Sequence, residues 1–375
     1  MRGLIDSTLR EGGQTVGVSF TLAQKVEIVR LLACLGIEEI ELGVATARDE
    51  ELPALFRHAR GLAVGCRLAL WCRLHAEDIR LAATLGPDVL SLSVPVSDRH
   101  MTKKLGLDRT QVLARLEEAV TQARSLGLSL VSLGLEDCTR ADQDFLVQVV
   151  QLAARLGIAR LRLADTVGRS DPRCFAKLVR KLRKCWLGEI AVHAHNDFGL
   201  ATASALACLD AGADWADVAV LGLGERAGLA RLEELVGFLV LGRDRDRKRY
   251  RVEWLPLLCE TVAIASGRGL APHHPVVGQR VFACETGLHL AGLLRAPETY
   301  EPFDPARIGS SRLLLFGEKT GRRAVQLQLA ALGLHPSPEV LTELVAEVRE
   351  QSRCLRRPLS VEELRQLAQA NILVS

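Results

Sequence analysis

The amino-acid sequence predicts an α/β fold in which a TIM (β/α)8 barrel is followed by a smaller, mainly helical C-terminal region. Strand-like and helix-like segments alternate through about the first 240 residues, and eight such units are the number that closes a barrel. The candidate strands end in polar or ionisable residues, as expected where strand ends carry the chemistry. We therefore place a TIM-barrel catalytic domain at residues 1–260, and a linker or lid with a helical subdomain at residues 261–375.

The eight expected strands have apolar interiors, and each is followed by a helical pattern. They are Gly3–Asp6, Glu38–Gly43, Leu62–Trp71, Asp88–Val94, Leu128–Leu135, Ile158–Ala164, Glu189–His193 and Asp217–Leu221. No Gly-x-Gly-x-x-Gly motif follows any of them, which disfavours an open dinucleotide-binding sheet. The first helix is expected over Thr21–Leu35, because Thr21 and Gln24 form a capping-box pattern and Gly36 stops the apolar stripe.

The sequence changes character after the barrel. Residues 242–251 alternate opposite charges, which favours a solvated connector over a phosphate-binding stretch. Residues Ala271–Arg312 are rich in Gly, Pro and His and are expected to form an ordered lid or linker. Helical patterns return at Pro338–Gln351 and again after Ser360, which forms a second capping-box pattern with Glu363.

The composition is that of an ordinary soluble globular protein, with 48% hydrophobic and 25% charged residues. A net charge of +3 gives no support to a nucleic-acid surface, although a mildly basic surface suits an anionic substrate. The ten cysteines include no Cys-x-x-Cys pair, which indicates a reducing compartment. No signal-peptide core or membrane-spanning run is present, so we expect a cytoplasmic protein with no membrane partner.

Two histidines at the end of the seventh expected strand are candidate metal ligands. His193 and His195 are two residues apart, so in a strand their side chains point to the same face. Two imidazoles on one face suit a divalent metal that takes a third ligand from elsewhere. Two ordinary polar residues at a strand end are the alternative interpretation.

The loop after the first strand supplies a carboxylate beside an arginine, Glu11 next to Arg10. By itself this is either a surface ion pair or part of a site. Because the barrel closes, strands one and seven are separated only by strand eight, so a carboxylate on this loop can complete the metal site. Three protein ligands leave open positions for a bidentate substrate such as a 2-oxoacid.

Four motifs in order along the chain resemble those of the metal-dependent enzymes that condense an acyl-CoA with a 2-oxoacid. They are Asp-Ser-Thr-Leu-Arg-Glu-Gly-x-Gln at 6–14, Leu-Ala-Asp-Thr-Val-Gly at 163–168, His-Ala-His-Asn-Asp at 193–197 and Gly-Leu-Gly-Glu-Arg-Ala-Gly at 222–228. This family comprises the isopropylmalate, homocitrate and citramalate synthases and is related to hydroxymethylglutaryl-CoA lyase. The resemblance runs through essentially the whole chain, including the region around His289 and Tyr300 after the barrel.

The resemblance implies a Claisen condensation assisted by a divalent metal, Mg²⁺ or Mn²⁺. Glu11, His193 and His195 would hold the metal, which polarises the keto group of the 2-oxoacid. Arg10 would stabilise the negative charge that develops on the oxyanion or enolate. The alternative role of Arg10 is that of a structural partner for Glu11.

Further site residues follow from the resemblance and from their positions at strand ends. They are Gln14, Arg73, Ser93 and Thr166 for substrate binding, and Glu136, His289 and Tyr300 for catalysis. Arg73 and Ser93 are expected to contact the distal carboxylate of 2-oxoglutarate, and Thr166 its other carboxylate. Thr166 is alternatively a helix-capping residue. His289 and Tyr300 match residues that assist deprotonation of the acetyl methyl group and that, in relatives, reach over the barrel of a partner subunit, so a homodimer is expected.

Within the family, the segments around Trp71, Ser93 and Glu136 are most similar to the homocitrate synthases of nitrogen fixation. The resemblance therefore implies a transferase that condenses acetyl-CoA with 2-oxoglutarate to give homocitrate and CoA. A lysine-pathway role, and the same chemistry on another 2-oxoacid, as in isopropylmalate or citramalate synthesis, stay open. A non-catalytic, metabolite-binding relative is the alternative from another class.

Three positions depart from the family pattern. Gly13 stands where relatives usually have Glu, Leu229 where they commonly have Asn near the metal, and Cys284 where many have His. The Leu229 difference matters most, because an amide that could assist the metal shell is missing. The three proposed ligands are intact, so we expect catalysis with a weaker hold on the metal.

Overall fold

The computed structural model describes residues 1–62, 65–244 and 248–374. These residues form two compact units, the first ending at Leu270 and the second beginning at Ala271, apart from a few residues after Val240 that group with the second unit. The division falls later than the residue 260 expected from the sequence, because the helix over Leu255–Ser266, α9, packs on a helix of the first unit, α1 (Leu22–Leu35).

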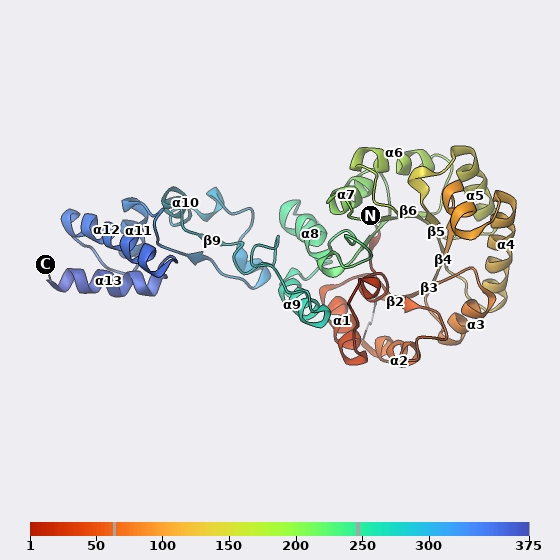
Figure 1. Ribbon diagram of the computed structural model, residues 1–375, viewed down its shortest axis with the longest axis horizontal. Coiled ribbons are helices and arrows are strands. Elements are labelled where there is room, and N and C mark those ends of the chain that lie inside the picture. Colours follow the sequence, from red (N-terminus) through yellow and green to blue (C-terminus); the bar gives the residue numbers. More distant parts are fainter. Residues whose placement is uncertain (63–64, 245–247, 375) are drawn as a thin grey trace. The chain divides into compact units, whose positions relative to one another are not determined.

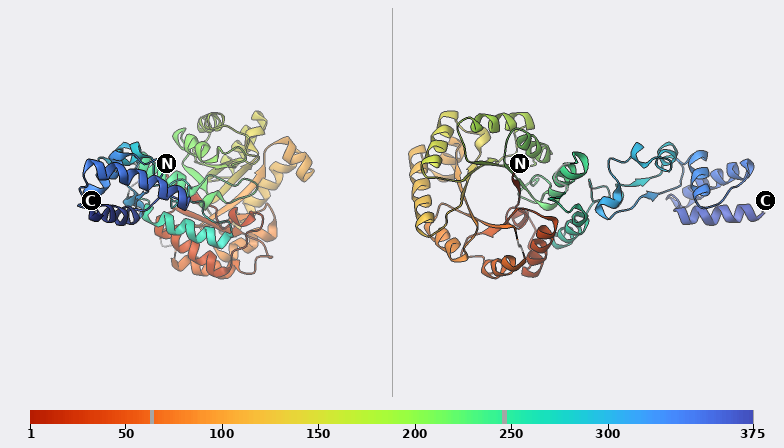
Figure 2. Two further views of the ribbon diagram at one scale, coloured as in Figure 1. Left: turned by 60° about the vertical axis from the view of Figure 1, so that its left-hand side comes forward. Right: turned by 180° about the vertical axis from the view of Figure 1, so that it is seen from behind.

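The first unit is a closed barrel of eight parallel strands, as the sequence predicts. The strands are β1 (Gly3–Asp6), β2 (Glu39–Val44), β3 (Arg67–Cys72), β4 (Val89–Pro95), β5 (Val131–Glu136), β6 (Arg160–Asp165), β7 (Glu189–Ala194) and β8 (Trp215–Val218). Each strand pairs with the next, and β1 pairs with β8 to close the ring. Figure 1 shows this ring with its helices outside, and Figure 2 shows it from behind.

Helices follow each barrel strand and cover the outside of the ring. Besides α1 they are α2 (Leu52–Leu62), α3 (Ala76–Leu85), α4 (Arg109–Ser125), α5 (Gln143–Arg155), α6 (Pro172–Arg183), α7 (Ala201–Asp210) and α8 (Leu232–Gly237). α1 begins as predicted, because the Thr21 hydroxyl accepts from the Gln24 N–H while the Gln24 side chain accepts from the Thr21 N–H. Gly36 ends it in the left-handed conformation, with φ of 99°.

Only β1 has its predicted limits, and the other seven strands begin or end one or more residues away from them. The differences at the start of β3 and at the end of β8 have local causes. β3 begins only at Arg67, because α2 still includes Leu62; residues 63 and 64, also inside the predicted strand, lie outside the described residues. β8 ends at Val218 rather than Leu221 because the chain turns there into a 3-10 helix, in which Leu221 has φ of 57°. The charged stretch 242–251, expected to be a connector, includes residues 245–247, which also lie outside the described residues.

Short helical turns complete both units. They are 3-10 turns at Gly12–Gln14, Cys138–Arg140, Val220–Gly222, Val252–Trp254, Pro297–Thr299 and Pro305–Ile308, and π-helical turns at Arg99–Leu105 and Phe238–Gly242. In the part of the chain that the structure describes, no helix combines the length and the apolar character needed to cross a membrane.

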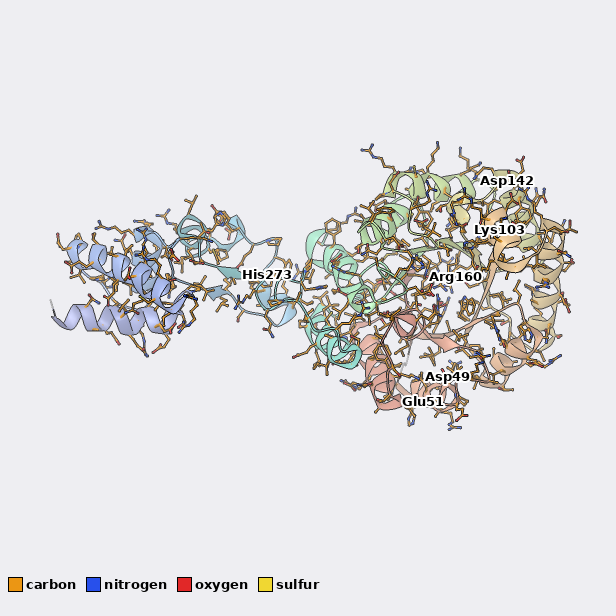
Figure 3. The ribbon with its side chains drawn as sticks, viewed as in Figure 1. Asp49, Glu51, Lys103, Asp142, Arg160 and His273 are labelled. Carbon is orange, nitrogen blue, oxygen red and sulfur yellow. The ribbon has the colours of Figure 1, made fainter. Side chains whose placement is uncertain are left out.

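The interior of the barrel is not uniformly apolar, in contrast to the prediction from the strands. Arg160 on β6 is fully buried within the ring and donates two hydrogen bonds, of 2.9 and 2.5 Å, to Glu39 on β2 (Figure 3). Its Nε also donates to the Ser132 hydroxyl at 3.0 Å. A buried ion pair is tolerated only when its hydrogen bonds are satisfied, as they are here.

The second unit is mainly helical, as predicted. It contains α10 (Gly287–Leu293), α11 (Arg322–Ala331), α12 (Pro338–Leu355) and α13 (Val361–Val374), with a two-stranded parallel sheet of β9 (Ala283–Cys284) and β10 (Leu313–Leu314). Its core is an apolar cluster that includes Leu290, Phe316 and Leu344. The second predicted capping box is present: the backbone N–H groups of Ser360 and Glu363 each donate to the other residue's side chain, at 2.8 and 3.2 Å.

Candidate active site

A pocket of about 240 Å³ opens at the carboxyl ends of the barrel strands. Eight of the eleven predicted site residues line it: Arg10, Glu11, Gln14, Ser93, Glu136, Thr166, His193 and His195. They come from the ends of β1, β4, β5, β6 and β7, so closure of the ring brings together residues that are far apart in sequence. Trp71, Lys104 and Arg162 are among the lining residues that sequence reasoning did not select as site residues.

The loop after β1 is shaped by a buried carboxylate. Asp6 accepts hydrogen bonds from the backbone N–H and the hydroxyl of Thr8, both at 2.9 Å. The N–H of Glu11 then donates to the carbonyl of Ser7 at 2.8 Å. This tight turn places Arg10 and Glu11 at the pocket. Burial raises the pKa of Asp6 to about 7, although the hydrogen bonds from Thr8 oppose the rise.

Glu11, His193 and His195 form the one cluster of potential metal ligands found among the described residues. One ligand atom from each lies within 4.8 Å of the other two, and all three residues are buried. The Nε2 atoms of His193 and His195 are 3.3 Å apart. Burial lowers the pKa of both imidazoles to about 3, with Arg162 adding to the effect at His193. Both rings are therefore neutral at physiological pH, which is the form that binds metals.

The hydrogen-bond donors and acceptors of this cluster fit a bound cation. The Asp217 carboxylate lies 2.6 Å from Nδ1 of His193, so this nitrogen carries the proton and the Nε2 lone pair points at His195. Nδ1 of His195 is buried without a hydrogen-bond partner among the described residues. If Nδ1 of His195 carries the proton, two Nε2 lone pairs face each other beside the Glu11 carboxylate. A divalent cation satisfies all three groups at once.

Buried charges beneath the cluster hold it in place. Glu41 on β2 accepts hydrogen bonds from the Ser7 hydroxyl at 2.8 Å and from Nε of Arg10 at 3.0 Å. Arg162 on β6 donates two more to Glu41, at 2.5 and 3.0 Å. Although burial opposes ionisation of Glu41, Arg10 and Arg162 lower its pKa well below the ordinary value. Arg10 also contacts Glu11, so its guanidinium is fixed between two carboxylates at the pocket.

Asp217 of β8 is a site residue that the sequence analysis missed. It is buried, contacts Arg162 and orients His193. Charged residues within the strands were the available signal for Glu41, Arg162 and Asp217, because a buried charge must be paired. Carboxylates that orient metal-bound histidines in this way fix the tautomer and strengthen the ligand.

We expect Asp217→Asn to weaken Mn²⁺ binding by roughly 10- to 100-fold, because the amide is a weaker partner for the Nδ1 proton of His193. Activity at saturating Mn²⁺ should fall less than activity at limiting Mn²⁺. A Mn²⁺ titration of both proteins by calorimetry checks this. An unchanged Mn²⁺ affinity would contradict the positioning role.

Thr166 lies at the pocket, and the alternative of helix capping is wrong. α6 begins only at Pro172 and is capped by Asp171, whose side chain accepts from the first-turn N–H groups. The Thr166 hydroxyl instead accepts a hydrogen bond from the Asp137 N–H at 2.8 Å. Its own proton remains available for a substrate oxygen. Asp165 accepts hydrogen bonds from the Thr139 hydroxyl and the Ser170 N–H, both at 2.8 Å.

Gln14, Ser93 and Glu136 also line the pocket. Glu136 forms an ion pair with Lys104 at 3.0 Å, and the Ser93 hydroxyl lies 3.5 Å from the carbonyl of Gly134. Gly134 has no room for a side chain, since an added Cβ would lie 2.7 Å from the Ser93 oxygen. The glycine therefore allows Ser93 to face the pocket.

Three predicted site residues are not brought to this pocket by the barrel. Arg73 lines a neighbouring cavity instead, and its guanidinium donates to Asp78 at 2.6 and 3.0 Å. His289 and Tyr300 belong to the second unit, where their rings pack with centroids 4.2 Å apart. Their place in catalysis stays a prediction.

The three departures from the family pattern have different surroundings. Leu229 is buried, and its backbone forms an isolated β-bridge with that of His195. It brings an apolar side chain and no ligand atom to the metal cluster. Gly13 has open space where a side chain would be, and Cys284 is a half-buried residue of β9.

Comparisons with known proteins agree with the fold and with the motifs. The HMGL-like family matches residues 3–249, and the family described as homocitrate synthase post-HMGL domain-like matches residues 276–354. The homocitrate synthase of Frankia alni is 41% identical over 338 residues, covering 88% of this chain and 93% of that protein. The 2-isopropylmalate synthase 2 of Caldanaerobacter subterraneus subsp. tengcongensis is 38% identical over 367 residues, covering 96% and 93%.

Solved structures share the barrel. An HMG-CoA lyase from Acinetobacter baumannii, determined with coenzyme A and 3-methylmalate, superposes with a TM-score of 0.61 at 19% identity, covering 71% of this chain and 92% of that one.

The family matches, the relatives and the site together define a Claisen-condensing enzyme built on a TIM barrel, of a family that depends on divalent metals. The chain belongs to the HMGL-like family, in the group of isopropylmalate, homocitrate and citramalate synthases.

Proposed function

We propose that this protein condenses acetyl-CoA with 2-oxoglutarate to give homocitrate and CoA. The observation that carries the proposal is the buried cluster of Glu11, His193 and His195 with Arg10 beside it, in a pocket that also holds the cation Lys104. Homocitrate synthases are among the most similar relatives, and they support 2-oxoglutarate as the oxoacid. The reducing, cytoplasmic setting expected from the sequence is part of this proposal.

The reaction joins the methyl carbon of the acetyl group to the keto carbon of the oxoacid, and water then releases CoA from the thioester. Glu11, His193 and His195 would hold a divalent cation, Mg²⁺ or Mn²⁺, which when bound polarises the keto group and stabilises charge on its oxygen. A cation held by three protein ligands would still be able to bind substrate oxygens.

The side chains around the cluster supply the remaining steps. Arg10, fixed by Glu41, points a guanidinium to where negative charge develops on the oxygen, which is the most effective place for it. The Thr166 hydroxyl donates to the substrate carboxylate. Glu136 lines the pocket and would move a proton, and Gln14, which also lines it, would help to orient the substrate.

His289 and Tyr300 are proposed to assist removal of a proton from the acetyl methyl group. Within the second unit their rings lie against each other, and Tyr300 is exposed, so both side chains can meet a substrate. We propose that they serve the barrel of a second subunit in a homodimer.

The test is release of free thiol from acetyl-CoA by the Mn²⁺-loaded protein with a panel of oxoacids. We expect turnover with 2-oxoglutarate and much slower turnover with 2-oxoisovalerate and pyruvate. Preferred turnover of 2-oxoisovalerate would replace homocitrate by isopropylmalate as the product, in line with the relative from Caldanaerobacter. No thiol release with any oxoacid, from folded and metal-loaded protein, would favour the non-catalytic alternative.

A further inference from the structure

A second cavity, of about 310 Å³, adjoins the pocket that holds the metal cluster. The two share four lining residues, Trp71, Ser93, Lys104 and Glu136. The second cavity is walled largely by apolar side chains from the end of β4, the π-helical turn Arg99–Leu105 and α4. Space therefore continues from the metal cluster past the Lys104–Glu136 ion pair.

The cations of the first pocket differ in how firmly they are held. Arg10 and Arg162 are buried, and each contacts two buried carboxylates. Lys104 has one ionic partner among the described residues, Glu136 at 3.0 Å, and 55% of its side chain is exposed. Lys104 is also the cation that both cavities share.

These differences determine which cationic side chain can exchange its present carboxylate partner for the carboxylate of a substrate. Moving Arg10 or Arg162 would leave buried carboxylates unpaired, which is strongly unfavourable. An exposed ion pair such as Lys104–Glu136 contributes little to stability and is easily exchanged. The lysine ammonium is a compact charge on a flexible stem, so it can leave Glu136 for a substrate carboxylate nearby.

We propose that Lys104 binds the distal carboxylate of the 2-oxoacid and so makes the enzyme prefer oxoacids that end in a carboxylate over those that end in a branched alkyl group. This inference rests on the proposed function and names the specificity residue of that site. It assigns to Lys104 the role that the sequence suggested for Arg73. Arg73 lines only the second cavity, and Asp78 already engages its guanidinium twice.

The test is calorimetric titration of 2-oxoglutarate and of 2-oxoisovalerate into the Mn²⁺-loaded protein without acetyl-CoA. Lys104→Met should weaken 2-oxoglutarate binding by roughly 10- to 100-fold, the worth of one hydrogen bond to a charged group, and leave 2-oxoisovalerate binding unchanged. Lys104→Arg should restore most of the loss. The matched control is Lys103→Met, which removes the same charge from the same turn at a residue that lines neither cavity (Figure 3).

Three outcomes would overturn the inference. They are an unchanged 2-oxoglutarate affinity in Lys104→Met, an equal loss for both oxoacids, and a selective loss in Arg73→Met instead. Thiol release by the wild-type protein is measured alongside. If the wild type binds 2-oxoglutarate without releasing thiol, the proposed function fails, while the comparison of dissociation constants still decides the role of Lys104.

Discussion

Glu11→Gln is expected to lower thiol release by about a thousandfold and to remove the bound metal. The amide keeps the shape of the side chain but loses the charge that a hard divalent cation requires. Lewis-acid stabilisation of a developing oxyanion contributes several kcal/mol, and about 4 kcal/mol corresponds to this factor. Metal content after dialysis and the rate of thiol release measure the two effects.

The matched control for this substitution is Glu225→Gln. Glu225 also lines the pocket, but it does not belong to the cluster with the two histidines. Adding Mn²⁺ at a hundred times its dissociation constant should stabilise the wild type and the control by about 2.7 kcal/mol against unfolding. Glu11→Gln should show no such gain. Mn²⁺-dependent stabilisation of Glu11→Gln equal to that of the wild type would show that the metal binds elsewhere.

Arg10→Met is expected to reduce kcat by roughly 100- to 1000-fold with little change in KM for either substrate. The reason is that Arg10 meets charge that exists in the transition state and not in the bound ground state, and such losses appear in kcat. Arg10→Lys should recover only part of the rate, since an ammonium cannot pair with Glu41 and the reacting oxygen with the same fork.

The structural alternative for Arg10 predicts a different result. If Arg10 serves only to hold Glu11 and Glu41, its removal should lower thermal stability and Mn²⁺ affinity together with activity. Circular dichroism melts and a Mn²⁺ titration of Arg10→Met separate the two roles. A fall in kcat that disappears at saturating Mn²⁺ would favour the structural role.

Local patterns predicted the barrel and the meeting of Glu11, His193 and His195. Two histidines two residues apart in a strand must share a face, and parallel strand ends must meet at one end of a barrel. Those rules were enough to predict that Glu11 meets His193 and His195, although these residues are far apart in the sequence. The capping boxes at Thr21 and Ser360 were predictable for the same reason, because they depend only on neighbouring residues.

Pairing across the barrel interior could not be predicted from one sequence. Glu41, Arg162 and Asp217 lie on three different strands, and nothing local says that their side chains meet beneath the metal cluster. The same gap explains Arg73, whose strand-end position suggested the pocket. Asp78 lies on the following helix and accepts a hydrogen bond from the Arg73 guanidinium, which does not line the pocket of the metal cluster. The direction of a long charged side chain therefore depends on its ion-pair partner as well as on the place of its residue at a strand end.

Labelled acetyl-CoA shows whether this site forms a carbon–carbon bond. Acetyl-CoA carrying ¹³C in its methyl group is incubated with 2-oxoglutarate, Mn²⁺ and the protein, and the products are followed by NMR. We predict that the label appears as a methylene carbon attached to the quaternary carbon of homocitrate. Label recovered as free acetate would mean that the thioester is hydrolysed without condensation, and the protein would then not be a condensing enzyme.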